Sequence, residues 1–160
     1  MQQTQRPCTR VFRDPVHFLA LGFGSGCAPK APGTFGTLAA IPLYLLAQPL
    51  PLWAYLLITV FGFLIGVWIC DRVAHDLGVH DHPAIVWDEV VGYFITMIAA
   101  PPGWLWVAVG FGLFRLFDIL KPWPIRQADR QIGGGFGIMF DDLLAAIYAG
   151  LVLQSLAWYF

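Results

Sequence analysis

Charge in this 160-residue chain is confined to three segments separated by long apolar runs, and this pattern limits the solvent in which the chain can fold. The charged segments are residues 1–36, 71–89 and 115–142. Hydrophobic residues make up 58% of the chain and charged residues only 12%. Soluble domains contain about half apolar and about a quarter charged residues. The composition therefore predicts a protein that lies in or on a lipid bilayer.

The apolar runs predict helical segments over residues 37–47, 52–70, 90–114 and 143–160. A helix needs about 20 residues to span the hydrocarbon core, so the first run is short for a full crossing. In the third run, Pro101 and Pro102 would end or kink a helix. We therefore predict helical hairpins that turn at residues 48–51 and 101–103, two segments that carry no charge.

Two such hairpins would bring all charged segments to one face, which the positive-inside rule makes the cytosolic one. We predict an all-α fold, a compact multi-pass helical membrane protein that forms one domain over residues 1–160. An alternative topology treats residues 90–114 as one tilted span, which would place Asp88 and Lys121 on opposite sides. The short segments could also enter the membrane and return on the same side.

The nine basic and ten acidic residues nearly balance, so no electrostatic feature favours a nucleic-acid partner. The cysteines Cys8, Cys27 and Cys70 lie far apart and lack the spacing of a metal site. We expect them to be reduced, structural thiols.

Two acidic pairs, Asp88 with Glu89 and Asp141 with Asp142, stand just before apolar helical runs. Carboxylates at helix N-termini can act as caps, which is the alternative to a functional role. Together with Asp118, these residues would form a cluster of five carboxylates that raise one another's pKa unless a cation neutralises them. Oxygen ligands without a nearby cysteine favour Mg²⁺ over zinc.

Basic residues accompany Asp118 along the chain. Arg115 and Lys121 lie three residues to either side of it, so on a helix all three share a face and Arg115 could pair with Asp118. Lys121 offers a compact charge and Arg126 a bidentate fork, a combination suited to a phosphate monoester. The alternative is that these side chains anchor the protein at the lipid headgroups.

Two glycine-rich runs, at residues 22–26 and 133–137, predict tight turns whose amides could form an anion nest. Neither run completes a nucleotide-binding motif. Gly33 and Thr34 precede the first apolar run, where Thr34 could be a helix N-cap or could support a ligand.

A histidine cluster offers a zinc site as a less favoured alternative. His75, His80 and His82 lie near several aspartates, but their spacing matches no recognised zinc motif. Asp71 and His75 are one helical turn apart and could pair or support the metal site. We expect His17 to be structural.

The sequence excludes two covalent mechanisms of phosphate hydrolysis. No cysteine is followed by arginine six positions later, and no two aspartates form a D-x-D motif, so covalent cysteine and aspartyl mechanisms are excluded. The remaining mechanism is a water activated by a metal, with a carboxylate as base and Lys121 and Arg126 stabilising charge. The alternatives are a divalent-cation carrier, whose carboxylates should lie near the bilayer midplane, and a non-catalytic membrane scaffold.

At the level of motifs, the chain resembles the bacterial phosphatidylglycerophosphatase A family. The resemblance rests on GFGSG at 22–26, PGTFGTLAAIP at 32–42, HDHPAIVWDEVVG at 80–92, FRLFDILKPWPIRQADR at 114–130 and GGGFGIMFDD at 133–142. It implies a Mg²⁺-dependent enzyme of the inner membrane, with its active site on the cytosolic face. Its phospholipid substrate would be phosphatidylglycerophosphate, and its product phosphatidylglycerol would feed cardiolipin synthesis.

The resemblance also implies roles for individual residues. The implied metal ligands are Asp88, Glu89, Asp141 and Asp142. The implied catalytic residues are Asp118, Lys121, Arg126 and Asp129. We assign phosphate binding to Lys121, Arg126 and Arg130, and the family pattern adds Gly33 and Thr34 as supporting positions. We assign Asp118 as a ligand or the base, and Asp129 as a residue that orients Arg126 or Arg130.

Overall fold

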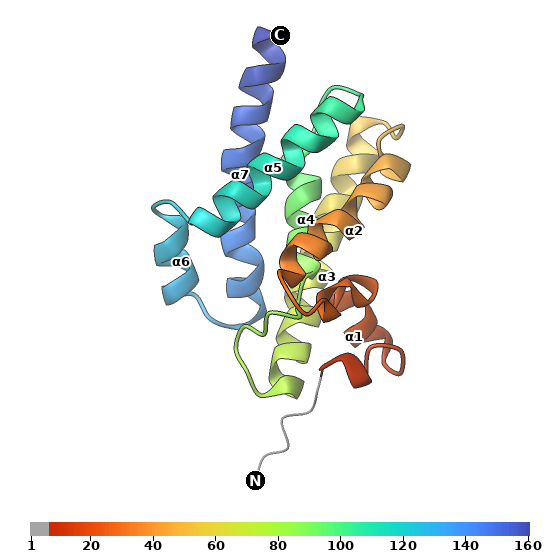
Figure 1. Ribbon diagram of the computed structural model, residues 1–160, viewed down its shortest axis with the longest axis vertical. Helices are drawn as coiled ribbons and strands as arrows, with labels where there is room; N and C mark the ends of the chain where they lie inside the picture. The colour runs from red at the N-terminus through yellow and green to blue at the C-terminus, as the bar shows by residue number, and fades with distance from the viewer. Residues whose placement is uncertain (1–6) are drawn as a thin grey trace.

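The computed structural model describes residues 7–160, and within this range the chain forms helices and loops without strands (Figure 1). The prediction of an all-α fold is confirmed. The elements are, in order, η1 (Pro7–Thr9), α1 (Pro15–Ala20), η2 (Gly22–Cys27), α2 (Pro32–Ala47), α3 (Leu52–Leu77), α4 (Trp87–Thr96), α5 (Trp104–Leu120), α6 (Ile125–Gln131) and α7 (Gly134–Tyr159).

Both predicted helical hairpins are present. Residues 48–51 separate α2 from α3, and residues 97–103 separate α4 from α5. In the second turn, Ala99 and Gly103 have φ angles of 54° and 122°, which a right-handed helix cannot contain. The alternative of one unbroken helix over residues 90–114 is therefore wrong.

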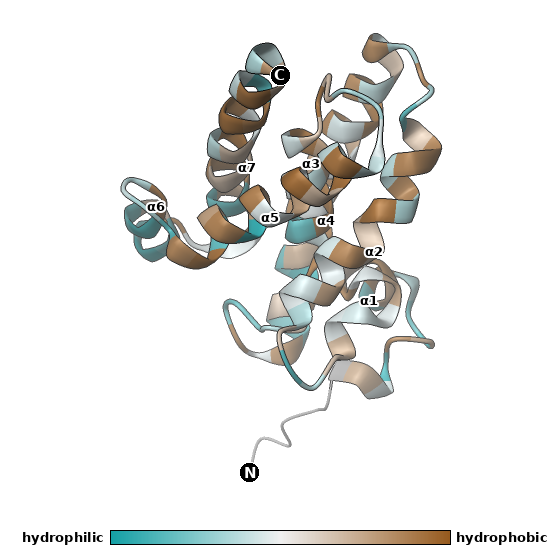
Figure 2. Ribbon diagram, turned by 45° about the horizontal axis from the view of Figure 1, so that its top comes forward, coloured by the Kyte–Doolittle hydropathy of each residue, from teal (hydrophilic) through white to brown (hydrophobic). Residues whose placement is uncertain are grey.

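The two hairpin turns and the C-terminus lie at one end of the molecule, at the top of Figure 1. The charged segments, namely α1, α6 and the loop between α3 and α4, lie in the opposite half. Figure 2 shows α6 in hydrophilic colours, whereas hydrophobic colours prevail on α5. The described charged residues thus gather away from the hairpin turns, as their sequence positions predict.

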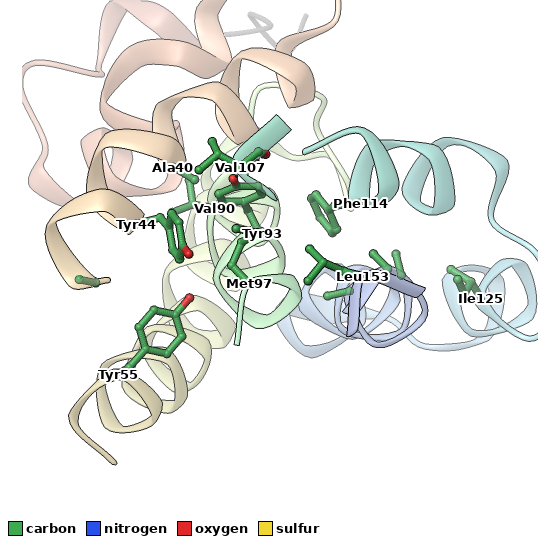
Figure 3. Packing of buried hydrophobic residues seen from close by; sticks show 14 residues of the cluster. Ala40, Tyr44, Tyr55, Val90, Tyr93, Met97, Val107, Phe114, Ile125 and Leu153 are labelled. Atoms are coloured by element: carbon green, nitrogen blue, oxygen red, sulfur yellow. Dashed lines mark hydrogen bonds between the residues drawn. The ribbon is translucent and has the colours of Figure 1, made fainter. Parts of the chain in front are cut away.

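Helix α7 organises the bundle, because it packs against α3, α4, α5 and α6. Its residues Ala145, Ala146 and Ala149 are completely buried, and such small side chains allow neighbouring helices to approach closely. The largest buried cluster includes Tyr93 and Leu153 and extends across the six helices α2 to α7 (Figure 3). The Tyr93 hydroxyl is satisfied within this core, since it donates to the Val107 carbonyl at 3.0 Å.

A row of large apolar side chains is exposed along one side of α3. Its members are Trp53, Leu57, Phe61, Leu64 and Trp68. Their spacing of three or four residues places them on one helical face. Helices α3 and α7, each of 26 residues, are long and apolar enough to cross a membrane by length and composition. The number of such helices alone is weak evidence for a membrane protein, but the exposed apolar row on α3 adds to it.

The expectation that all cysteines are reduced is wrong for one pair. Cys8 and Cys27 form a disulfide that joins η1 to η2. The chain turns back through α1, so that the Cα atoms of two cysteines 19 residues apart lie 5.8 Å from each other. Cys70 is free and buried, as expected of a structural thiol.

Candidate active site

The charged segments build one cavity of about 290 Å³ between the start of α2, the start of α4, the end of α5 and α7. Its lining includes every carboxylate of the predicted cluster together with Lys121. These acidic residues are Asp88, Glu89, Asp118, Asp141 and Asp142. The second hairpin brings Asp88 and Lys121 to the same cavity, as the hairpin topology requires and the unbroken span would forbid.

Three of the carboxylates form a tighter group. Asp88, Glu89 and Asp142 each offer an oxygen, and these oxygens lie within 4.8 Å of one another. One oxygen of each residue is buried and accepts no hydrogen bond: Oδ1 of Asp88, Oε2 of Glu89 and Oδ2 of Asp142. Unpaired buried charge of one sign is costly unless a cation compensates it. We name these three residues the carboxylate triad.

Burial of the triad favours its protonated forms when no cation is bound. Desolvation raises the pKa of Glu89 to about 7, and desolvation together with the neighbouring Glu89 raises the pKa of Asp88 well above its usual range. A set of oxygen ligands without nitrogen or sulfur suits a hard divalent cation. The triad therefore fits the predicted metal class.

Asp141 and Asp142 do not cap a helix. Helix α7 begins at Gly134, so both residues lie about two turns inside it and are buried. The capping alternative, which assumed a helix that starts near residue 143, is wrong for this pair. Carboxylates held inside a buried helix have no structural task at its N-terminus, so their position favours a functional role.

The start of α7 is capped by side chains from other segments. The Gly134 amide donates to Nε2 of His80 at 2.7 Å, and the Gly135 amide donates to Oδ1 of Asp71 at 2.9 Å. These two amides are therefore occupied and cannot form the anion nest that the glycine run suggests. Asp71 accepts this hydrogen bond from α7, in place of the suggested pair with His75. It thereby fixes the helix that carries Asp141 and Asp142.

Lys121 connects the cavity to α6. It ends α5 in a left-handed conformation, with φ 43°, and its Nζ lies 2.6 Å from Oδ2 of Asp141 and 3.0 Å from Oδ1 of Asp129. Burial alone would lower the pKa of Lys121, but the hydrogen bonds to these two carboxylates raise it above its usual value. Asp141 thus forms an ion pair with Lys121 and lies outside the triad. Asp129 contacts Lys121, in place of the expected Arg126 or Arg130.

Arg115 is a site residue whose full role the sequence does not reveal. It donates to Asp118, the pairing that helical spacing predicts, and Nη1 also lies 3.8 Å from Oε1 of Glu89 on α4. The second contact arises from the packing of α4 against α5, which local spacing cannot predict. Arg115 therefore positions both Glu89 and Asp118 at the cavity wall.

Gly33 lines the cavity, whereas Thr34 does not. A Cβ atom at position 33 would collide with the carboxylate of Glu89, so glycine is needed for the close approach of α2 to α4. The N-cap of α2 is Ala31, so the alternative that Thr34 caps this helix is wrong. The helix begins earlier because Pro32 occupies its first turn, a position that proline favours.

Arg126 and Arg130 lie outside the carboxylate cavity. Both line an adjoining cavity of about 460 Å³, and Lys121 lines the two cavities. The structure thus brings Lys121 to the carboxylates, whereas Arg126 shares only the adjoining cavity with Lys121.

The histidines do not assemble a zinc site. Among the described residues, the potential metal-ligating atoms that come together in a group of three are those of the triad, which contains no histidine. His80 caps α7, and Nδ1 of His82 accepts from the Ala84 amide. His17 is completely buried, with nitrogen atoms 3.4 Å from Asp14 and 3.9 Å from Asp76, which agrees with the expected structural role.

Comparison with known proteins identifies the family. The model of the family described as phosphatidylglycerophosphatase A matches residues 18–157. The chain belongs to the phosphatidylglycerophosphatase A family. This membership confirms the resemblance seen in the motifs, and it supports an enzyme over a cation carrier or a scaffold.

Curated relatives cover most of this family member. It is 51% identical to phosphatidylglycerophosphatase A of Escherichia coli over 141 residues. This alignment covers 88% of this chain and 82% of the relative. It is 49% identical to the Haemophilus influenzae protein of the same name, over 91% of both chains. A Bacteroides thetaiotaomicron relative, 38% identical over 88% of this chain and 92% of its own, carries the provisional name phosphatidylinositol-3-phosphatase. No solved structure matches the chain.

Proposed function

We propose that this protein hydrolyses phosphatidylglycerophosphate to phosphatidylglycerol and inorganic phosphate, with Mg²⁺ as its cofactor. The observation that carries the proposal is the buried carboxylate triad beside Lys121, in a chain that belongs to a family of lipid phosphatases. The product would then be available for cardiolipin synthesis.

The charge of the cavity supports the need for a cation. A phosphate monoester is an anion, and it would be repelled by the carboxylates that line the cavity, which are the five of the predicted cluster and Asp81. Asp88, Glu89 and Asp142 would hold the divalent cation, through oxygens that otherwise lack partners. When bound, Mg²⁺ would offset the charge of the phosphoryl oxygens and lower the pKa of a water molecule.

The remaining residues have separate tasks in this proposal. Lys121, fixed by Asp129 and Asp141, would bind the monoester and stabilise negative charge as the phosphorus–oxygen bond breaks. Asp118 lines the cavity without belonging to the triad, so it would accept the proton of the attacking water. Arg115 would position Asp118, to which it donates.

The apolar row on α3 supports a location in the bacterial inner membrane. Trp53 and Trp68 stand at its two ends, about 22 Å apart along the helix. Tryptophan is enriched at both membrane interfaces, and the Arg72 guanidinium lies 5.8 Å from the Trp68 ring. In a multi-pass arrangement with the charged half in the cytosol, the cavity would lie at headgroup depth and meet the phosphate without removal of the acyl chains from the bilayer.

Release of inorganic phosphate from phosphatidylglycerophosphate in neutral detergent micelles tests the proposal. We expect the purified protein to release phosphate with Mg²⁺ and to lose this activity in excess EDTA. Activity that persists in EDTA would contradict the metal-assisted mechanism. A folded protein that releases no phosphate under either condition would contradict the proposed function itself.

A further inference from the structure

A second cavity adjoins the carboxylate cavity and differs from it in charge. Its volume is about 460 Å³, and it lies between the end of α5 and α6. Its charged lining residues are Lys121, Arg126 and Arg130, and none of its lining residues is acidic. We name it the arginine cavity. Lys121 also lines the carboxylate cavity, so the two spaces meet at this side chain.

The two arginines are available to a ligand. Both are exposed, and among residues 7–160 neither forms an ion pair, whereas Lys121 is engaged by Asp129 and Asp141. Their spacing of four residues places Arg126 and Arg130 on the same face of α6. Two unpaired guanidinium groups at one concave surface are suited to a phosphate oxyanion, which each can bind in a bidentate manner.

The proposed substrate carries two phosphates of different kinds. Its terminal monoester is the group that is hydrolysed, and its phosphodiester joins the headgroup glycerol to the diacylglycerol. The glycerol that separates them has only three carbons. A substrate whose monoester lies beside the triad would therefore extend past Lys121 toward the neighbouring arginine cavity.

We propose that Arg126 and Arg130 bind the phosphodiester of the substrate headgroup and so select lipids that carry a second phosphate. This inference rests on the proposed function and assigns a separate task to the two arginines. The provisional name of the Bacteroides thetaiotaomicron relative describes a lipid that also carries one phosphodiester and one monoester. The same arrangement of two anion sites would suit both headgroups.

Selectivity between two substrates tests this inference. Phosphatidic acid has a monoester but no second phosphate, so it can fill only the carboxylate cavity. We would measure kcat/KM for phosphatidylglycerophosphate and for phosphatidic acid with wild type and the double variant Arg126→Gln, Arg130→Gln, in neutral micelles with Mg²⁺. We expect the ratio of the two values to fall roughly tenfold to a hundredfold in the double variant, because charge-assisted hydrogen bonds to one substrate are lost.

Arg13→Gln is the matched control, since it removes an exposed positive charge beside α1 and far from the arginine cavity. It should leave the selectivity ratio unchanged. A double variant that folds like wild type but keeps the wild-type ratio, or that loses both activities in proportion, would overturn the inference. Wild type that does not hydrolyse phosphatidylglycerophosphate would contradict the proposed function, which is a different result.

Surrounding anionic lipids carry a phosphodiester whose charge no headgroup cation neutralises, as the substrate does. Vesicles of phosphatidylcholine, with or without phosphatidylglycerol, separate these two sources. If the arginines bind the substrate, the loss of selectivity persists in vesicles of phosphatidylcholine alone. If they bind bulk anionic lipid, the variant loses activity only in the vesicles with phosphatidylglycerol and equally for both substrates, which would overturn the inference.

Discussion

At the scale of single residues, the site depends on buried carboxylates that lack internal partners. The residual exposure of Asp88 is 8% and that of Asp142 is 3%, and each has an oxygen that accepts no hydrogen bond. A fold that required these residues only for stability would pair such atoms. The arrangement is instead expected of a protein that leaves coordination positions open for a cation.

We predict that Asp142→Asn lowers phosphate release from phosphatidylglycerophosphate by at least roughly a hundredfold, since one ligand of the triad is lost. In EDTA at a pH above 7 the same variant should unfold at a higher temperature than wild type, because a neutral amide does not carry the free-energy cost of ionising a buried carboxyl group beside two others. Kinetics in micelles and thermal unfolding would measure the two effects.

Asp76→Asn is the control for this prediction, because it neutralises an exposed carboxylate outside the cavity. It should retain turnover. An Asp142→Asn variant with near-normal turnover would remove this residue from the proposed site.

The sequence predicts which residues gather in the site better than it predicts what each one contacts. All five carboxylates and Lys121 line one cavity, as their motifs indicate. The pairing of Asp129 with Lys121 and the contact between Arg115 and Glu89 were not predicted. Both depend on how separate helices pack, and no local spacing contains that information.

At the scale of elements, α7 connects the site to the rest of the bundle. The hairpin turns were predictable because proline and glycine interrupt the apolar runs. The start of α7 at Gly134 was not predictable, since a run of three glycines is typical of a loop. The helix begins there because Asp71 and His80 accept the amide hydrogens of its first turn and glycine permits close packing against α3.

Substitution of glycine by alanine at two positions tests this role of α7. At Gly135 a Cβ atom would collide with the carbonyl of Val67 on α3, whereas at Gly112 on α5 it would meet nothing within 4 Å. We predict that Gly135→Ala lowers the thermal unfolding temperature and reduces turnover, because α7 must move away from α3 and shift Asp142.

Gly112→Ala should stabilise the protein by about 0.5–1 kcal/mol, since alanine favours the helix more than glycine does. Hydrogen–deuterium exchange of residues 134–142 would report the local effect of Gly135→Ala. Equal stability of the two variants would show that the close approach of α7 to α3 is not required.

At the scale of the whole molecule, the charged half and the apolar half have different tasks. The apolar half provides the core and the exposed row on α3, and the charged half provides both cavities. Hydropathy alone predicts this division. It does not predict the disulfide between Cys8 and Cys27, which depends on the three-dimensional course of η1, α1 and η2.

The pH dependence of stability should differ between the protein in EDTA and the protein with bound Mg²⁺. In EDTA, burial raises the pKa of Glu89 from 4.5 to about 7, so between these values the folded state holds a proton that the unfolded state has released. Stability in EDTA should therefore decrease as pH rises from about 4.5 to about 7, by up to roughly 3 kcal/mol.

Added Mg²⁺ should oppose this loss at pH 7.5, because a cation that binds the folded state stabilises it. Thermal unfolding in detergent across this pH range, with and without Mg²⁺, measures both effects. Stability in EDTA that rises over the interval would contradict a protonated, cation-free triad.

The central claim is that Asp88, Glu89 and Asp142 together hold a divalent cation. Electron paramagnetic resonance of Mn²⁺ added to the purified protein tests it most directly, because bound and free Mn²⁺ give different signals without any need for turnover. The account predicts that wild type and Asp76→Asn bind Mn²⁺, that Mg²⁺ displaces it, and that Asp142→Asn loses the bound signal. Equal binding by wild type and Asp142→Asn would contradict the assignment of the triad as the metal site.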